Sequence, residues 1–274
     1  MTQQLLEPTK TDPPQFNWSI PIRGVALTLG LVVLVLGAGS VVGYFMIRTD
    51  TDTRFFTGTI HRLQVRTTDG NVVIRPGSST QVGATVVSRK HSAYRTAGHS
   101  ESVNGDLLTV DASCRGGFFI ADQCSVDLEI TVAAGTEVTA TTSTGNISVT
   151  ATRGPVTARS STGDLRVSRA TGPVTLNTNV GDITGELLDS ARVLGRSNTG
   201  DVRLSFATAP EQVQGYTDIG DVRILVPDDA KTYRVSTEVD LGDRHIDVPT
   251  DPASSRTVDL STSTGDVRIG LLSQ

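Results

Sequence analysis

Ser161-Thr162-Gly163-Asp164-Leu165-Arg166-Val167 is one of seven related stretches that fill the C-terminal half of the chain. In each stretch a Gly-Asp or Gly-Asn step follows a short polar segment, and in five of them two apolar residues follow, two positions apart. Successive glycines of these steps lie 18, 18, 19, 20, 22 and 23 residues apart. A period near twenty with one tight corner per unit predicts a stacked repeat architecture. The corner glycines are Gly145, Gly163, Gly181, Gly200, Gly220, Gly242 and Gly265; Asn146 follows the first, and Asp164, Asp182, Asp201, Asp221, Asp243 and Asp266 follow the others.

Each repeat contains two short strand patterns and two turns. After the Gly163 corner, Leu165 and Val167 alternate with polar residues, and a second turn at Gly172-Pro173 precedes another strand pattern. About 18 residues are too few for a well-separated hairpin but suffice for one coil of a solenoid. The repeat therefore predicts an all-β, two-sheet β-solenoid with coils of about 18–23 residues over 136–274, in which equivalent strands pair in parallel.

Glycine and aspartate have separate roles in the predicted corner. Glycine adopts the positive φ of a tight corner without steric cost from a Cβ. Aspartate or asparagine is expected to accept a hydrogen bond from a nearby backbone N–H in a local turn. Stacked carboxylates repel one another, and arginines two residues further on are expected to offset this through ion pairs between coils. These arginines are Arg166, Arg203, Arg223 and Arg268.

The residues before the repeat also alternate with a period of two. From Val126 to Val132 the apolar and polar residues alternate strictly, as in a half-buried strand. Ser88–Ser102 is a largely polar stretch and is expected to form a loop. We predict an N-terminal β portion over 57–135 that is continuous with the solenoid.

An uncharged apolar segment lies near the N-terminus. Residues 24–47 span roughly 36 Å as a helix, enough to cross a hydrocarbon core of about 30 Å. A cleaved signal peptide is the alternative, because Ala38-Gly39-Ser40 resembles a cleavage site, but signal h-regions are only about 7–15 residues long. We expect a disordered cytoplasmic tail over 1–23, a transmembrane helix over 24–47, a juxtamembrane linker over 48–56 and a C-terminal domain outside the cytoplasm.

Cys114 and Cys124 are the only cysteines of the chain. A close pair in an extracytoplasmic domain favours a disulfide, and two independent free thiols are the alternative. The pair brackets Arg115-Gly116-Gly117-Phe118-Phe119, which is expected to form a hairpin tip.

Composition and motifs argue against several classes of function. The formal net charge is −5 without a long basic stripe, which argues against nucleic-acid binding. The glycine-rich corners lack the Lys-Ser or Lys-Thr of a phosphate loop, and no Gly-x-Ser-x-Gly motif occurs. The aspartates do not follow the denser Gly-Asp nonapeptide of calcium-binding solenoids. We expect no catalytic residues, no cofactor and no metal.

The final strand pattern, Asp266–Leu271, ends three residues before the C-terminus. We therefore expect no capping element over this coil, and its edge is expected to offer unpaired N–H and C=O groups to another chain. Self-association through the C-terminal coil is therefore expected, and fraying of this coil is the alternative.

The run from Val126 to Gly135, followed by the Ser-Thr-Gly-Asn and Ser-Thr-Gly-Asp units, resembles a bacterial domain-of-unknown-function family labelled "putative adhesin". The resemblance covers about residues 57 to 272. It implies a β-solenoid surface domain behind one N-terminal transmembrane helix, and it brings no catalytic residues. The Cys114–Cys124 segment departs from the family pattern.

These observations predict a single-pass membrane protein with a non-enzymatic, adhesin-like binding or scaffolding role in a bacterial envelope. Its partner is expected to be an envelope polymer or a membrane protein. The alternative is an accessory subunit of an envelope-stress or signalling system that contacts a sensor protein. A polysaccharide-active enzyme would need paired carboxylates in a groove, and the regular aspartate column is better explained by turn chemistry.

Overall fold

The computed structural model describes residues 33–34, 48–56, 59–77, 84–91, 95–116 and 123–272. Apart from residues 33 and 34, the predicted tail and transmembrane helix lie outside the described residues. Among the described residues, no helix combines the length and the apolar character needed to cross a membrane.

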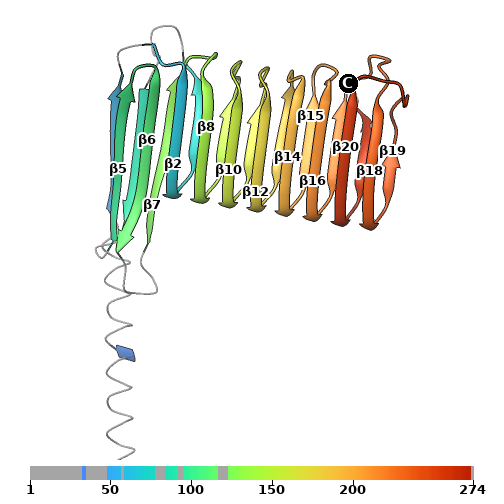
Figure 1. The fold of residues 1–274 in the computed structure, drawn as a ribbon. Coiled ribbons are helices and arrows are strands. Elements are labelled where there is room, and N and C mark those ends of the chain that lie inside the picture. Colours follow the sequence, from blue (N-terminus) through green and yellow to red (C-terminus); the bar gives the residue numbers. More distant parts are fainter. Residues whose placement is uncertain are drawn as a thin grey trace, which may run out of the picture.

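The domain is an elongated stack of two β-sheets whose strands lie side by side along its length (Figure 1). One sheet has eleven strands and the other has ten. The eleven-stranded sheet contains, in spatial order, β1 (Arg48–Phe55), β4 (Ala84–His91), β7 (Cys124–Val132), β3 (Val72–Pro76), β9 (Ile147–Thr150), β11 (Leu165–Ser168), β13 (Ile183–Leu188), β15 (Val202–Phe206), β17 (Val222–Val226), β21 (Val267–Leu271) and β19 (Arg244–Ile246). The ten-stranded sheet contains β18 (Arg234–Leu241), β20 (Thr257–Thr264), β16 (Gln212–Ile219), β14 (Arg192–Thr199), β12 (Val174–Val180), β10 (Val156–Thr162), β8 (Glu137–Thr144), β2 (Arg62–Asp69), β6 (Leu107–Gly116) and β5 (Arg95–Asn104).

The predicted all-β, two-sheet solenoid is confirmed. One strand of each sheet and the Gly-Asp corner between them form a coil, and equivalent strands of adjacent coils pair in parallel and in register, as in Val156↔Val174. The two-residue period of a strand then brings every second side chain between the sheets. Val138, Val156 and Val174 form one such internal row, and each is at most 2 % exposed. Because one coil cannot cover its own apolar face, burial of these rows makes the stack the stable unit.

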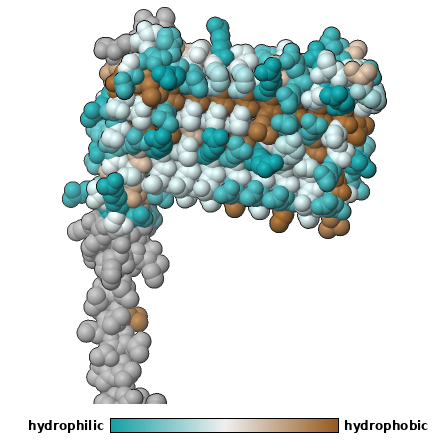
Figure 2. Space-filling view, viewed as in Figure 1, coloured by the Kyte–Doolittle hydropathy of each residue, from teal (hydrophilic) through white to brown (hydrophobic). Residues whose placement is uncertain are grey.

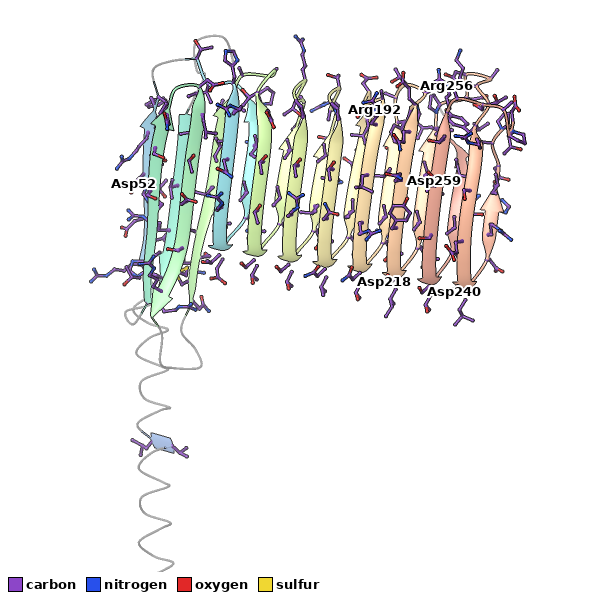
Figure 3. The ribbon with its side chains drawn as sticks, viewed as in Figure 1. Asp52, Arg192, Asp218, Asp240, Arg256 and Asp259 are labelled. Atoms are coloured by element: carbon purple, nitrogen blue, oxygen red, sulfur yellow. A yellow bond between two sulfur atoms is a disulfide. The ribbon has the colours of Figure 1, made fainter. Side chains whose placement is uncertain are left out.

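Most outward positions carry polar residues, so much of the visible face is pale or hydrophilic in Figure 2, apart from a hydrophobic band that runs along the stack near its upper edge. The corners lie along one long edge of the stack. Asp218 and Asp240, which lie just before two corner glycines, mark this edge in Figure 3, whereas Asp259 lies on the sheet face.

The N-terminal portion closes the stack with antiparallel strands. β1 pairs antiparallel with β4, β4 pairs antiparallel with β7, and β5 pairs antiparallel with β6. Two sequence expectations differ from this arrangement. Arg48–Phe55 was expected in a linker but forms β1, and much of the polar stretch Ser88–Ser102, expected as a loop, lies in β4 and β5.

Coils do not stack in chain order at either end. The coil β2–β3 lies between β6–β7 and β8–β9, and the last coil in sequence, β20–β21, lies between β16–β17 and β18–β19. Figure 1 shows β20 between β16 and β18. The expectation that the C-terminal coil forms the open end of the solenoid is therefore wrong. β18 and β19, which precede it in sequence, form that end.

The side chains of the two coils explain this exchange. Arg244 occupies the position that is Val267 in the last coil, and Thr237 occupies the position of Leu260. Val267 is fully buried and Leu260 is 2 % exposed, whereas Arg244 is exposed at the end of the stack and donates a hydrogen bond from Nη1 to Thr237 Oγ1 (3.3 Å). An arginine buried between two coils without a partner would cost several kcal/mol. The more polar coil therefore takes the end, and the apolar coil fills the interior.

Candidate functional site

The corner glycines combine a positive φ with close contact to the neighbouring coil. Gly200 has φ of 137°, and a Cβ added there would lie 2.1 Å from the carbonyl oxygen of Gly181. A Cβ contact below 3 Å requires the backbone to move. The seven predicted corners share this geometry, with φ between 137° and 144°. Gly70 (φ 141°) forms a further corner of the same kind, between β2 and β3, which the repeat pattern missed.

The corner carboxylates and amides form one continuous ladder along the stack. Asp164 Oδ1 accepts the backbone N–H of Asp182 (2.9 Å), and Asp182 Oδ1 accepts that of Asp201 (2.9 Å). The sequence predicted local turns, but these hydrogen bonds join neighbouring coils, because the next corner amide lies one strand spacing away. In space the ladder runs through Asp127, Asn71, Asn146, Asp164, Asp182, Asp201, Asp221, Asp266 and Asp243.

A second ladder satisfies the corner carbonyls. Buried hydroxyl groups of the ten-stranded sheet donate to the glycine carbonyl of the preceding coil, for example Ser160 to Gly145 (3.1 Å) and Thr217 to Gly200 (2.8 Å). Most corners therefore use a glycine, an Asp or Asn oxygen and a hydroxyl group to join coils, and Val239 takes the place of the hydroxyl residue in the end coil. The predicted corner residues have structural roles in this arrangement.

The arginine row follows the aspartate ladder only in part. Arg203 pairs with both Asp182 (3.0 Å) and Asp201. Arg166 pairs instead with Glu186, and Arg268 lies 3.7 Å from Asp247. Arg223 has no ion pair among the residues that the structure describes. Of these four arginines, only Arg203 pairs with aspartates of the corner ladder, and the pairs of Arg166 and Arg268 join neighbouring coils through other carboxylates.

Cys114 and Cys124 form a disulfide, which confirms the predicted pairing. Their Cα atoms lie 5.9 Å apart, within the ordinary range for a bridge. The bond joins β6 of the ten-stranded sheet to β7 of the eleven-stranded sheet. It therefore ties the two sheets together at the N-terminal end of the stack.

An open groove of about 500 Å³ lies on the outer face of β2, β6 and β5, close to this disulfide. Strand pairing places Arg66, Asp111 and Ser100 side by side in one row across the three strands, and Arg115 and Thr96 in another. Between these rows lie Thr68, Ser113 and Gly98. Because the middle row has only small side chains, it forms the floor of the hollow.

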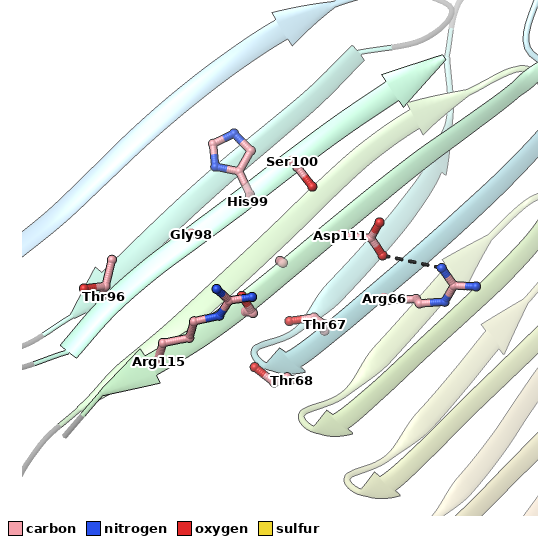
Figure 4. A pocket seen from close by; sticks show the side chains of 11 residues that line it. Arg66, Thr67, Thr68, Thr96, Gly98, His99, Ser100, Asp111 and Arg115 are labelled. Atoms are coloured by element: carbon pink, nitrogen blue, oxygen red, sulfur yellow. Dashed lines mark ion pairs between the residues drawn. The ribbon is translucent and has the colours of Figure 1, made fainter. Parts of the chain in front are cut away.

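Polar and charged groups line the groove (Figure 4). Arg66 Nη1 lies 3.7 Å from Asp111 Oδ1, a long contact between half-exposed side chains. Arg115 extends its guanidinium toward the middle of the groove and has no ion pair among the described residues. Thr68 Oγ1 accepts the backbone N–H of Cys114 (3.0 Å), which fixes β2 beside β6 at the floor.

This groove was not predicted from the sequence. Thr96, Gly98 and Ser100 fall within the stretch expected to be a loop, because small polar residues on the outer face of β5 conceal the two-residue period. The signal that could have revealed the strand is Ala97, His99 and Glu101, which alternate with those residues and face the interior. The Glu101 side chain is 1 % exposed and lies 3.5 Å from Arg54 Nε.

The described residues contain no cluster of three or more His, Cys, Asp or Glu side chains that could hold a metal ion. Asp111 is the one carboxylate that lines the groove, and it faces Arg66. The arrangement can supply hydrogen bonds and positive charge to a polar ligand.

The model of the Toastrack DUF4097 family matches residues 60–194. This match confirms the resemblance to a domain-of-unknown-function family over these residues. The match covers β2 to β13, the first three residues of β14 and every strand of the groove. It ends before the exchanged C-terminal coils.

Three solved structures that are similar to the chain are titled as adhesion proteins. A "putative adhesin" from Bacteroides fragilis has a TM-score of 0.45 and 11 % identity, covering 82 % of this chain and 97 % of its own. A "putative cell adhesion protein" from Clostridium sporogenes has a TM-score of 0.37 and 8 % identity, covering 82 % and 100 %. A "putative adhesin" from Parabacteroides merdae has a TM-score of 0.34 and 12 % identity, covering 82 % and 97 %. No curated protein matches the chain.

Proposed function

We propose that this chain is a non-enzymatic binding or scaffolding protein, anchored in a bacterial membrane by residues 24–47, with its solenoid outside the cytoplasm. One observation carries the proposal. The groove on β2, β6 and β5 combines two arginines and several hydroxyl groups on a rigid sheet, and its single carboxylate faces an arginine. Glycoside hydrolysis ordinarily needs two carboxyl groups that flank one bond.

The favoured partner is an envelope polymer. A polymer presents the same chemical group many times, so a shallow groove with modest affinity for one unit holds it through repeated contacts. The rest of the stack then acts as a stiff arm, since each coil is fixed to its neighbours by two hydrogen-bond ladders.

The test is chemical crosslinking of the tagged full chain on intact cells, followed by purification and identification of the bound material. We expect envelope polymer to be recovered. Recovery of one defined membrane protein would instead support an accessory role in a signalling system. Recovery of neither would contradict the proposal.

A further inference from the structure

We propose that the groove on β2, β6 and β5 binds a glycan segment that carries a carboxylate group. This inference rests on the proposed binding function and names the chemistry of its ligand.

The shape of the groove fits a flat, polar, chain-like ligand. A Cβ added to Gly98 would meet no atom within 4 Å, so the hollow above this residue is free of protein. Asp111 and Arg115 lie four residues apart on β6, about 13 Å at the rise of a β-strand. The groove therefore extends along the strand far enough for more than one sugar ring.

The lining chemistry favours a sugar over an apolar or aromatic ligand. Thr68, Ser113, Thr96 and Ser100 offer hydroxyl groups that both donate and accept hydrogen bonds, as sugar hydroxyls require. Ala112 is the one apolar residue in the lining, and it is only 6 % exposed. The apolar part of the surface therefore comes mainly from methyl and methylene groups of polar residues, which can lie against the faces of a sugar ring.

The charges favour an acidic sugar over a neutral one. Arg66 and Arg115 bring two positive charges to the groove and Asp111 brings one negative charge, whereas the whole chain has a formal net charge of −5. The Arg115 guanidinium, without an ion pair among the described residues, is free to form a bidentate contact with a carboxylate. One excess positive charge matches one carboxylate for each bound segment.

The experiment is calorimetric titration of the full chain in detergent with tetragalacturonate, and with its methyl ester as the uncharged match. We expect the acid to bind and the ester to bind at least about tenfold more weakly. Arg115→Gln should weaken binding of the acid by about tenfold, a loss typical of one charge-assisted contact. Arg159→Gln, on the same sheet face outside the groove, is the control and should leave binding unchanged.

Filling the hollow provides an independent test. Gly98→Leu should abolish binding without unfolding β5, because its side chain enters empty space. Gly135→Leu is the matched control, since a Cβ at that exposed glycine also meets no atom within 4 Å. Equal binding of acid and ester, or unchanged binding by both groove variants, would overturn this inference. If these variants still capture envelope polymer on cells, the proposed function stands and the assigned groove is wrong.

Discussion

At the scale of single residues, the corners show why the repeat needs both glycine and an oxygen acceptor. The glycine allows the carbonyl of the next coil to approach. The Asp or Asn oxygen then accepts the neighbouring amide. Asn71 and Asn146 occupy ladder positions otherwise held by aspartate, so the position needs an oxygen and does not need a charge.

Asp201→Asn should therefore change the free energy of unfolding by less than about 0.5 kcal/mol, because it keeps the oxygen acceptor and loses only a surface ion pair with Arg203, which still has Asp182 as a partner. Asp201→Ala should cost about 1 kcal/mol, because the Asp221 amide (2.7 Å away) loses its acceptor. Gly200→Val is the destabilising reference, expected to cost at least about 3 kcal/mol. Chemical denaturation measures all three, and equal losses for the Asn and Ala variants would contradict the ladder.

Tyr233 is a buried tyrosine whose hydroxyl has no hydrogen-bond partner among the described residues. Burial, reinforced by the charge of Asp229, raises its pKa to about 12, above the usual value of about 10. The fold therefore favours the neutral form. Its contribution to stability is complete below pH 10 and is lost as the pH rises from about 10 to 12.

Tyr233→Phe should remove this alkaline loss, and it should leave stability at pH 7 unchanged or raised by up to about 1 kcal/mol. Urea unfolding of both proteins at pH 7, 10 and 11.5 checks this expectation. A variant that loses as much stability as the wild type between pH 10 and 11.5 would show that other groups cause the loss.

At the scale of elements, the exchanged coils are the main departure from the sequence prediction. Periodicity defines the coils but does not say which coils are neighbours, because every coil has nearly the same pattern. Arg244 is the signal in the sequence, since it replaces the apolar residue that directly follows most corners. The residue alone does not place its coil at the end of the stack. The placement follows from the cost of burying Arg244, and that cost depends on which coils lie on either side.

Cysteine pairs can test the order of the coils. Gln214 lies directly beside Asp259, and Asp259 lies beside Ser236, so Gln214 and Ser236 are two strand spacings apart, about 10 Å. The pair Gln214→Cys with Asp259→Cys should form a disulfide on oxidation. The pair Gln214→Cys with Ser236→Cys should not, because Cα atoms more than about 7 Å apart cannot be bridged. Mass spectrometry of unreduced digests distinguishes the two, and the reverse result would mean that coils stack in chain order.

At the scale of the whole molecule, both ends of the stack carry charged residues. The exposed Arg244 lies at one end, and the buried Glu101 side chain with the exposed Arg54 lies at the other. Charges at these positions disfavour pairing of an edge strand with another chain. The expected self-association through the C-terminal coil assumed that this coil has a free edge. β21 instead pairs with a strand on each side.

The two-sheet solenoid, its corners and the disulfide could all be predicted from the sequence, because each depends on local spacing. Two features could not be predicted from the sequence: the antiparallel strands β1 and β5 that close the stack, and the groove. Both depend on how segments far apart in sequence pair. They also depend on the outer face of β5, where the side chains are small and polar. The groove residues Arg66, Gly98 and Arg115 come together only through the pairing of β2, β6 and β5.

The disulfide should stabilise the N-terminal end alone. Replacing Cys114 and Cys124 by serine opens a loop of about ten residues and should cost about 2–3 kcal/mol in the chain-entropy model. Because each coil contacts only its neighbours, the loss should be confined to β5, β6 and β7 and their immediate neighbours. Hydrogen exchange should show faster opening there and unchanged protection in β12 to β16. A uniform loss along the stack would contradict this local coupling.

The most direct test of the account is a site-specific photocrosslink on intact cells. A photoreactive residue at Ser100, on the rim of the groove, is compared with one at Thr157, on the same sheet face beyond the groove. We predict a polymer adduct at position 100 and little polymer adduct at position 157. Equal adducts at both positions, or an adduct at position 157 alone, would contradict the claim that this groove is where the protein holds its ligand.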